Sequence, residues 1–339
     1  MKISLFAYSR QGCRTARKVM SCFPEADLRA HTMERFAEEG FYPIRRPAEP
    51  FYGELFNLSD ALIFIGSCGI AVREIAPHVR DKQTDPAVVC IDELGRFVIP
   101  LLSGHIGGAN EMALKIAEHL GAVPVITTAT DINNRFSVDA WAARNGLVID
   151  NIHIAKRVSA AILERDIPLC CDFPVVTSLP NGVVAGDSGE LGICISYRKI
   201  SPFELTLRLI PKILHIGIGC RRGTSDSAIN DAVKAVFERH ELDIRAVRCA
   251  ASIDLKANEE GLLKYCKDNS LTPVFYSAEE LRGVPGEFTA SGFVQSVTGV
   301  DNVCERAALI GADELVVKKT ALNGVTVAVA AEKTEVRFG

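Results

Sequence analysis

The sequence lacks a long apolar run, an excess of basic charge and the motifs that bind nucleotides. None of its hydrophobic stretches approaches the roughly 20 residues that a membrane-spanning helix requires. Lysine and arginine total 38 against 42 aspartate and glutamate residues, a net charge of −4, so the overall positive field of a nucleic-acid-binding protein is missing. No Walker motif and no G-x-G-x-x-G dinucleotide motif occurs. We therefore expect neither a membrane nor a nucleic acid as partner.

Metal-binding and disulfide patterns are also missing. The eleven cysteines include no C-x-x-C spacing, and no histidine pair has the H-E-x-x-H spacing of a zinc site. Residues 1–18 lack a small-residue cleavage site and are predicted to begin with a strand, not to form a signal peptide. An odd number of cysteines in such a chain is typical of reduced thiols in the cytoplasm. We predict a cytoplasmic protein with no cofactor of its own.

The sequence does contain a regular alternation of strand-like and helical segments. Short apolar runs predict strands at residues 2–8, 61–65, 88–91, 97–100 and 123–126. An apolar face across residues 109–120, followed by Gly121, predicts a helix and its end. This alternation predicts an α/β fold with layered sheet-and-helix domains at both ends, a largely parallel sheet and a small mixed α/β middle domain.

The 339 residues correspond to two domains or slightly more at about 150 residues per domain. We predict an N-terminal α/β domain over 1–136, a small middle domain or connector over 137–211, and a C-terminal α/β domain over 212–339. Strands are predicted in the last two parts at residues 173–179, 183–185, 193–197, 213–218, 244–250 and 273–276. The spacing of Ser277 and Glu280 predicts a capping box that begins a helix.

Glycine-rich turns follow several of these predicted strands. They are Gly66 to Gly69, SGHIGGAN at 103–110 and GIGCRRG at 217–223. Such turns allow a ligand to approach the backbone, and in open α/β sheets ligands bind at the carboxyl edge of the strands. A fourth turn at 9–14 follows the first predicted strand and contains Arg10 and Arg14, and the turn at 217–223 contains Arg221 and Arg222. Together they predict a ligand with several anionic groups, although each turn alone is equally well explained as a tight strand-to-helix connection.

Several polar residues in or near these turns are candidates for chemistry. His105 lies in a glycine loop and not on an apolar face, which favours a general base or a hydrogen-bond donor. Thr127, Thr128 and Asp131 follow a predicted strand, and the spacing of Thr298 and Asp301 fits either a helix cap or ligand contact. Cys220 precedes a predicted helix, where a lowered thiol pKa would allow a thiolate nucleophile as an alternative.

Four of these segments occur together in a recognisable order. SGHIGGAN at 103–110, ITTATD at 126–131, GIGCRRGT at 217–224 and VTGVDNVCE at 297–305 resemble the cobalt-precorrin-5A hydrolase family (CbiG) of anaerobic cobalamin biosynthesis. The segment DLKANE at 254–259 is also similar to that family. The resemblance extends over nearly the whole chain. It implies three regions, the last of them similar to a stand-alone protein of the aerobic pathway.

The resemblance also implies a reaction on cobalt-precorrin-5A, a ring-contracted cobalt tetrapyrrole that bears a δ-lactone. Water opens the lactone, and the two-carbon fragment formed by C20 and its methyl group leaves as acetaldehyde, giving cobalt-precorrin-5B. Cobalt arrives inside this substrate, whose acetate and propionate side chains would suit several glycine turns and arginines. Transient contacts with neighbouring pathway methyltransferases are expected.

We hypothesise that His105 activates the water and that the backbone N–H groups of Gly107 and Gly108 stabilise the oxyanion. Asp131, Asp301 and Glu305 are alternative bases that the sequence does not rank. The remaining predicted substrate contacts are Gly66, Gly69, Ser103, Gly104, Asn110, Thr127, Thr128, Gly217, Gly219, Cys220, Arg221, Arg222, Thr289, Ser291 and Thr298.

Two other functions are compatible with the same residues. A non-catalytic corrinoid carrier of the same pathway would use the same turns and arginines. An α/β enzyme that acts on phosphorylated metabolites would use the turns as phosphate sites.

Overall fold

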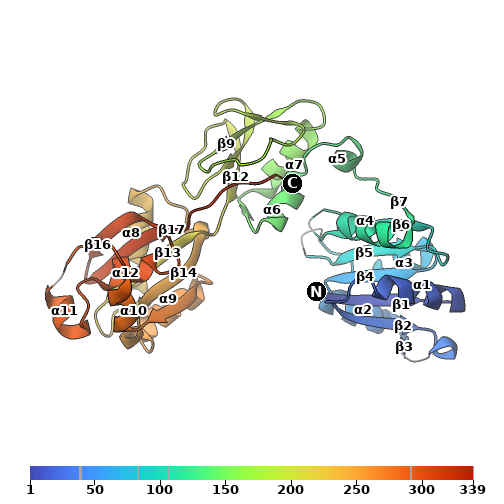
Figure 1. Cartoon of the computed structure of the whole chain (residues 1–339), viewed down its shortest axis with the longest axis horizontal. Coiled ribbons are helices and arrows are strands. Elements are labelled where there is room, and N and C mark those ends of the chain that lie inside the picture. The colour runs from blue at the N-terminus through green and yellow to red at the C-terminus, as the bar shows by residue number, and fades with distance from the viewer. Residues whose placement is uncertain (38–39, 82–83, 106, 291, 339) are drawn as a thin grey trace. The chain divides into compact units, whose positions relative to one another are not determined.

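The computed structural model describes residues 1–37, 40–81, 84–105, 107–290 and 292–338, and it divides into two compact units, Met1–Arg144 and Asn145–Gly339. Unit 1 contains a seven-stranded sheet and unit 2 contains two five-stranded sheets. Each unit combines strands with helices (Figure 1), so the predicted α/β class is confirmed, although the strands between residues 167 and 220 follow one another without a helix. The strands of each sheet lie within one of the three predicted regions, but residues 137–144 cluster with unit 1. The predicted boundaries stay a prediction.

Unit 1 contains a sheet with helices on both faces, in which the last two strands run antiparallel to the other five. Its elements are β1 (Lys2–Ala7), α1 (Arg10–Met20), β2 (Asp27–Thr32), η1 (Glu34–Phe36), β3 (Phe41–Pro43), α2 (Ala48–Leu58), β4 (Ala61–Ile65), α3 (Cys68–Ile75), β5 (Ala87–Ile91), β6 (Phe97–Leu102), α4 (Ala109–Leu120), β7 (Val123–Pro124), α5 (Ala129–Ile132) and α6 (Val138–Arg144). The strand order is β3-β2-β1-β4-β5-β6-β7. The first five strands in this order are parallel, whereas β6 is antiparallel to β5, and β7 is parallel to β6.

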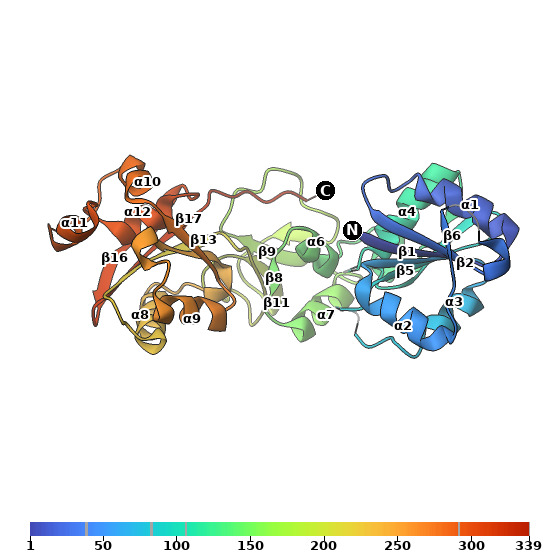
Figure 2. The ribbon, with the colours of Figure 1, turned by 90° about the horizontal axis from the view of Figure 1, so that it is seen from below.

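Helices cover both faces of this sheet, with α1 and α4 on one side and α2 and α3 on the other (Figure 2). The alternation of side chains along β1 explains this arrangement. Ile3 and Leu5 pack with the apolar residues of α1 and α4, while Phe6 points to the opposite face. There it joins an aromatic core that includes Tyr52 of α2 and Phe64 of β4. A sheet covered on both faces accounts for the nearly continuous apolar runs in the sequence.

Unit 2 contains two smaller sheets. The first is built from β8 (Val148–Ile149), β9 (Ile167–Cys171), β10 (Val183–Ala185), β11 (Leu191–Ile195) and β12 (Leu205–Ile210), with α7 (Ile152–Ala161), in the order β10-β9-β11-β12-β8. The second is built from β13 (Leu214–Cys220), β14 (Val247–Ile253), β15 (Thr272–Tyr276), β16 (Glu314–Leu322) and β17 (Val325–Ala331), in the order β15-β14-β13-β17-β16. Its helices are α8 (Asp226–Arg239), η2 (Ile244–Ala246), η3 (Asp254–Lys256), α9 (Glu260–Asp268), α10 (Ala278–Gly283), α11 (Gly292–Thr298) and α12 (Val303–Leu309).

Three local expectations are settled by the structure of unit 2. The capping box is confirmed, because Ser277 and Glu280 exchange hydrogen bonds at the start of α10. The strand predicted at 173–179 is wrong: Val175 makes only an isolated bridge, because Pro174 has no N–H to donate and the residues that follow are partly exposed. The strand predicted at 244–250 begins at Val247, since Asp243 caps a 3₁₀ turn over Ile244–Ala246.

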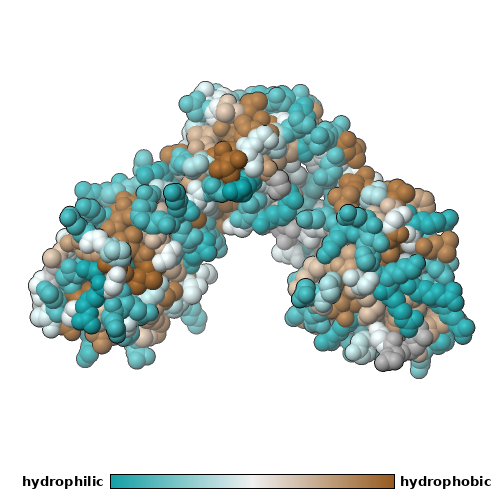
Figure 3. All heavy atoms as spheres, in the orientation of Figure 1, coloured by the Kyte–Doolittle hydropathy of each residue, from teal (hydrophilic) through white to brown (hydrophobic). Residues whose placement is uncertain are grey.

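Among the described residues, no helix has the length and apolar character needed to cross a membrane. Figure 3 shows hydrophilic residues spread over the visible surface of each unit, with smaller hydrophobic areas between them.

Candidate functional site

The direction of β6 determines which of the predicted turns in unit 1 lie together. Gly66 and Gly69 follow β4, at the carboxyl edge of the parallel strands. Because β6 is antiparallel to β5, the loop after β6 emerges at the opposite edge, where Ser103 Oγ donates to the carbonyl oxygen of Asp85 at 2.9 Å. The turn at Gly66–Gly69 and the loop at 103–110 therefore lie at opposite edges of the sheet. The His105 loop belongs with the strand end of β7 instead.

Close backbone packing explains the glycines of the 103–108 loop. A Cβ on Gly104 would lie 2.7 Å from Asn110 Oδ1, and a Cβ on Gly107 would lie 2.4 Å from Ser103 Cβ. Gly108 has a φ of 80°, and its N–H donates to the carbonyl oxygen of His105 at 3.0 Å. This amide is thus already used inside the loop, which argues against its hypothesised role as an oxyanion donor. The loop geometry serves first to fix the position of His105.

The imidazole of His105 lies between two carboxylates. Its Nε2 atom is 3.1 Å from Asp131 Oδ2, and its Nδ1 atom is 3.5 Å from Asp139 Oδ1. Thr130 Oγ1 lies 3.2 Å from the same Nε2 atom. The loop before α4, helix α5 and helix α6 each contribute to this cluster. A proton on either ring nitrogen therefore faces a carboxylate oxygen.

A side-chain amide connects this cluster to the segment after β7. Asn110, in the first turn of α4, donates from Nδ2 to Asp131 Oδ2 at 2.7 Å and to Thr128 Oγ1 at 2.9 Å. Thr127 is exposed beside them. The structure therefore brings together His105, Asn110, Thr128 and Asp131, which the sequence placed in two separate segments. We call His105, Asn110, Thr128, Thr130, Asp131 and Asp139 the histidine cluster.

The carboxylates control the protonation of His105. The contact with Asp139 raises the pKa of His105 above its ordinary value, burial acts in the opposite direction, and Asp131 raises this pKa further. The side chain of Asp139 is 9% exposed and that of Asp131 is 37% exposed. A proton that reaches this imidazole is therefore stabilised by two negative charges, one buried and one accessible to solvent.

Sequence analysis missed Asp139 and Thr130. Asp139 lies in the first turn of α6, where an acidic residue commonly stabilises the positive end of the helix dipole and therefore does not stand out. In addition, the predicted boundary placed residue 139 in the middle region. Thr130 was read as part of a polar turn. Neither residue has a spacing that identifies it as a partner of His105, because the contacts depend on how α5 and α6 fold back on the loop.

In unit 2, Gly217 and Gly219 lie inside β13 and not in the turn that follows it. A Cβ on Gly217 would lie 1.8 Å from the carbonyl oxygen of Cys304, and a Cβ on Gly219 would lie 2.5 Å from Thr326 Oγ1. These glycines allow β13 to pack closely against α12 and β17. The prediction that Gly217 and Gly219 lie in a turn is wrong, because both lie within β13. Close packing explains why each of these positions is a glycine.

Substituting Gly217 with alanine is expected to destabilise unit 2 by about 1–3 kcal/mol, because the rigid backbone of α12 must move to accept the methyl group. Thermal unfolding followed by circular dichroism measures this loss. Gly283→Ala is the matched control, since a Cβ there meets no atom within 4 Å. Equal stability of the two variants would contradict the packing explanation.

The turn after β13 carries Cys220, Arg221 and Arg222. Both arginines are exposed, and burial raises the pKa of the Cys220 thiol, contrary to the lowered pKa expected at a helix start. The N–H of Gly223 donates to Glu259 Oε1 at 2.5 Å, and Lys256 Nζ lies 2.9 Å from Glu259 Oε2. A cavity of about 670 Å³ lies here, lined in part by Arg222 and Glu259. A thiolate nucleophile at Cys220 is not supported.

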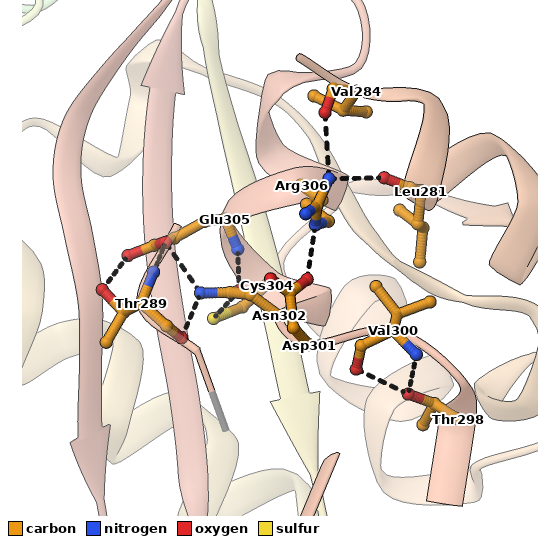
Figure 4. A network of polar contacts seen from close by, with 10 residues as sticks. All are labelled: Leu281, Val284, Thr289, Thr298, Val300, Asp301, Asn302, Cys304, Glu305 and Arg306. Atoms are coloured by element: carbon orange, nitrogen blue, oxygen red, sulfur yellow. Dashed lines mark hydrogen bonds and ion pairs between the residues drawn. The ribbon is translucent and has the colours of Figure 1, made fainter. Parts of the chain in front are cut away.

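Glu305 is the centre of a buried polar network in unit 2 (Figure 4). Its side chain is 1% exposed and accepts hydrogen bonds from the N–H and Oγ1 of Thr289, from Asn302 Nδ2 and from the N–H of Lys319, at 2.7 to 2.9 Å. Both carboxylate oxygens are thus fully used. This arrangement fixes the segment at Thr289 and the strand β16 against α12, and it leaves no oxygen exposed to a substrate.

The other predicted residues of this region make local contacts. Asp301 forms an ion pair with Arg306 at 2.8 Å, which lowers the pKa of Asp301. Thr298 Oγ1 bonds to the backbone of Val300, and Asn302, not Thr298, caps α12. Ser291 lies outside the described residues. These residues belong to unit 2, so the two groups of candidate bases come from different compact units.

A larger cavity, of about 790 Å³, lies on the α2 face of unit 1 and is lined by none of the predicted residues. His31 contributes to its wall, and burial lowers the pKa of this histidine to about 4. Its ring nitrogens are buried, and a ligand does not reach them without rearrangement. The histidine cluster, and not this larger cavity, is therefore the candidate functional site of unit 1. Within the described part of the chain, no group of three or more metal-ligating side chains is arranged to hold an ion.

Comparisons with known proteins bear on the chain as a whole. Residues 51–131 match the family model "Cobalamin synthesis G N-terminal", and residues 214–330 match "Cobalamin synthesis G C-terminus". A cobalt-precorrin-5A hydrolase of Salmonella typhimurium is 35% identical and covers 96% of each chain, and one of Priestia megaterium is 32% identical over 96% of this chain and 94% of its own. The solved structure of CobE, a protein from the cobalamin biosynthetic pathway, covers 36% of this chain and 92% of its own at 28% identity, with a TM-score of 0.34.

The histidine cluster lies within the matched N-terminal segment except for Asp139, which is eight residues beyond its end, and the Glu305 network lies within the matched C-terminal segment. Two relatives above 30% identity match almost the entire chain. The chain therefore belongs to the cobalt-precorrin-5A hydrolase family of cobalamin biosynthesis.

Proposed function

We propose that this chain hydrolyses the δ-lactone of cobalt-precorrin-5A and releases the C20 two-carbon fragment as acetaldehyde, with the histidine cluster as the site of proton transfer. The observation that carries the proposal is the position of His105, 3.1 Å from Asp131 and 3.5 Å from the buried Asp139. A neutral imidazole in this position becomes charged at low cost when it accepts the proton of water. The two relatives that match nearly the whole chain are named cobalt-precorrin-5A hydrolases, which supports this substrate.

The first step is attack of water on the lactone carbonyl. His105 Nε2 takes one proton of the water, and the exposed Asp131 stabilises the imidazolium that forms. The bond between the acyl carbon and the ring oxygen breaks, which leaves an alkoxide on the carbon that bears the methyl and a carboxylic acid on the macrocycle, and the acid then loses its proton to solvent. A proton must be returned to that oxygen, and the protonated His105 supplies it.

The second step resembles a retro-aldol cleavage. The hydroxyl group loses its proton, the carbon–carbon bond to the macrocycle breaks, and acetaldehyde leaves. The electron pair of the broken bond passes to the cobalt-containing macrocycle, which is the substrate itself. His105 and Asp131 can accept the hydroxyl proton in this step as they accept the water proton in the first.

Recognition of the carboxylate-rich substrate requires positive charge at specific places, since the chain carries a net charge of −4. Arg221 and Arg222 are exposed at the end of β13, and Arg222 lines the cavity of about 670 Å³. The predicted role of this turn in binding carboxylates of the tetrapyrrole stays a prediction. The contacts with pathway methyltransferases and the cytoplasmic location stay predictions.

The test is a product assay with oxygen labelling. Incubating the protein with cobalt-precorrin-5A in water labelled with oxygen-18 is expected to give one acetaldehyde per substrate, trapped as its hydrazone, and one labelled oxygen in the new carboxylate of the corrinoid. Binding of the substrate without acetaldehyde would instead favour the corrinoid carrier. Inhibition by inorganic phosphate with no corrinoid binding would favour an enzyme of phosphorylated metabolites.

A further inference from the structure

The two carboxylates around His105 differ in burial and in the ring nitrogen that they face. Asp131 lies beside Nε2, is 37% exposed, and already accepts a hydrogen bond from Asn110. Asp139 lies beside Nδ1 and is only 9% exposed. The neutral imidazole has one proton for two nitrogens, so these carboxylates compete for it.

The contact with Asp131 is the shorter one, 3.1 Å against 3.5 Å, but burial favours Asp139. A carboxylate that loses an N–H partner must be compensated by water or by another donor, and the buried Asp139 has less access to water than Asp131. Thr130, which is 5% exposed, has its hydroxyl oxygen 3.2 Å from Nε2 and can donate its proton to that nitrogen. With the proton on Nδ1, Asp139 keeps its N–H partner and Asp131 keeps Asn110 as a donor, while Thr130 can donate to Nε2 only until the attacking water takes its place.

Asp139 is itself fixed by its own helix. Its Oδ1 atom accepts hydrogen bonds from Ser137 Oγ at 2.9 Å and from the N–H of Ala140 at 3.0 Å. Val138 and Trp141, on either side, are buried in the core. The carboxylate is thus held in one orientation before any substrate binds, which is the property required of a group that orients another.

We propose that Asp139 is the positioning residue of the site: it keeps the proton of neutral His105 on Nδ1, so that Nε2 is the atom that takes the proton of water. The proposal deepens the proposed function, because it rests on His105 as the proton acceptor. Asp139 does not touch the reacting atoms in this arrangement. It acts through the orientation and the tautomer of the imidazole.

The tautomer of the wild-type protein is the first test. In protein labelled with nitrogen-15 at histidine, the His105 signals are identified by their loss in His105→Gln, and their chemical shifts report which nitrogen carries the proton. We expect protonated Nδ1 and unprotonated Nε2 in the neutral form. A neutral His105 protonated on Nε2 would overturn the proposal without any variant of Asp139 having to fold.

The pH dependence is the second test. The charged groups in contact with the ring are Asp131 from α5 and Asp139 from α6, and both raise the pKa of His105. Removing the charge in Asp139→Asn should therefore lower this pKa. Because the unprotonated imidazole accepts the proton, the acidic limb of the kcat profile should move to lower pH. A limb that stays in place in the folded variant would contradict the assignment.

The kinetic test separates positioning from folding. Asp139→Asn is expected to lower kcat about 10- to 100-fold with KM nearly unchanged, and Asp139→Glu should recover part of that loss by restoring the carboxylate. Asp27→Asn, an isosteric change at a side chain that is 59% exposed, is the control and should keep full activity. Full activity of Asp139→Asn beside an inactive His105→Gln overturns the positioning role. Full activity of both variants would instead remove His105 as the proton acceptor of the proposed function.

Discussion

Replacing His105 with glutamine is expected to abolish acetaldehyde release while the corrinoid still binds. Glutamine keeps the polar character and approximate length of the side chain but cannot accept a proton near neutral pH. Positioned proton transfer contributes about 10²- to 10⁴-fold to a rate, and kcat should fall by a factor in that range. Substrate binding is followed by the change in corrinoid absorbance, and product by trapped acetaldehyde, so that the two effects are measured on one sample.

Helix α4, which follows the loop that carries His105, offers a matched control for this variant. His119 lies in the last turn of α4, where its ring contacts Ser21 Oγ at 3.0 Å, far along the helix from the loop that carries His105. His119→Gln should therefore leave both corrinoid binding and acetaldehyde release unchanged. If His105→Gln retains full activity, His105 has no part in the mechanism and Asp131 becomes the remaining candidate base of the histidine cluster.

The sequence was sufficient for the fold class and for four of the six residues of the histidine cluster. Apolar periodicity located most elements within a few residues, because strands of a doubly covered sheet must be apolar on both faces. The predicted loop at 103–110 and the polar segment at 127–131 do meet, through Asn110 and Asp131. When a helix connects two neighbouring parallel strands, the loops that follow the two strands lie side by side. The meeting of these two segments could therefore be expected from the predicted strands and the helix between them.

The features that the sequence did not reveal depend on the direction of a strand and on the burial of individual carboxylates. Nothing in the composition of β6 shows that it runs antiparallel to β5, yet that reversal separates the His105 loop from Gly66 and Gly69. Likewise, a carboxylate has the same formula whether it accepts four hydrogen bonds in the core or faces a substrate. Glu305 and Asp139 could be distinguished only by the donors that surround them.

Replacing Glu305 with glutamine is expected to lower the free energy of unfolding strongly and to change kcat little. The carboxylate receives four donors, and the amide group of glutamine would turn its own N–H bonds toward some of them. An unsatisfied buried donor costs about 1–3 kcal/mol, and the lost charge adds to this, so the free energy of unfolding should fall by about 2–4 kcal/mol. For a unit of this size, that corresponds to a decrease of roughly 5–15 °C in Tm.

The outcome decides between a structural and a catalytic Glu305. If the residue stabilises the packing of Thr289 and β16 against α12, the folded variant should release acetaldehyde at nearly the wild-type kcat at a temperature well below its Tm. Glu314→Gln, the same change at an exposed position of β16, controls for the loss of one charge. A variant with unchanged Tm and a kcat lower by two orders of magnitude would instead identify Glu305 as the base. That result would require the substrate to reach a carboxylate that is 1% exposed, and hence an opening of the segment around Thr289.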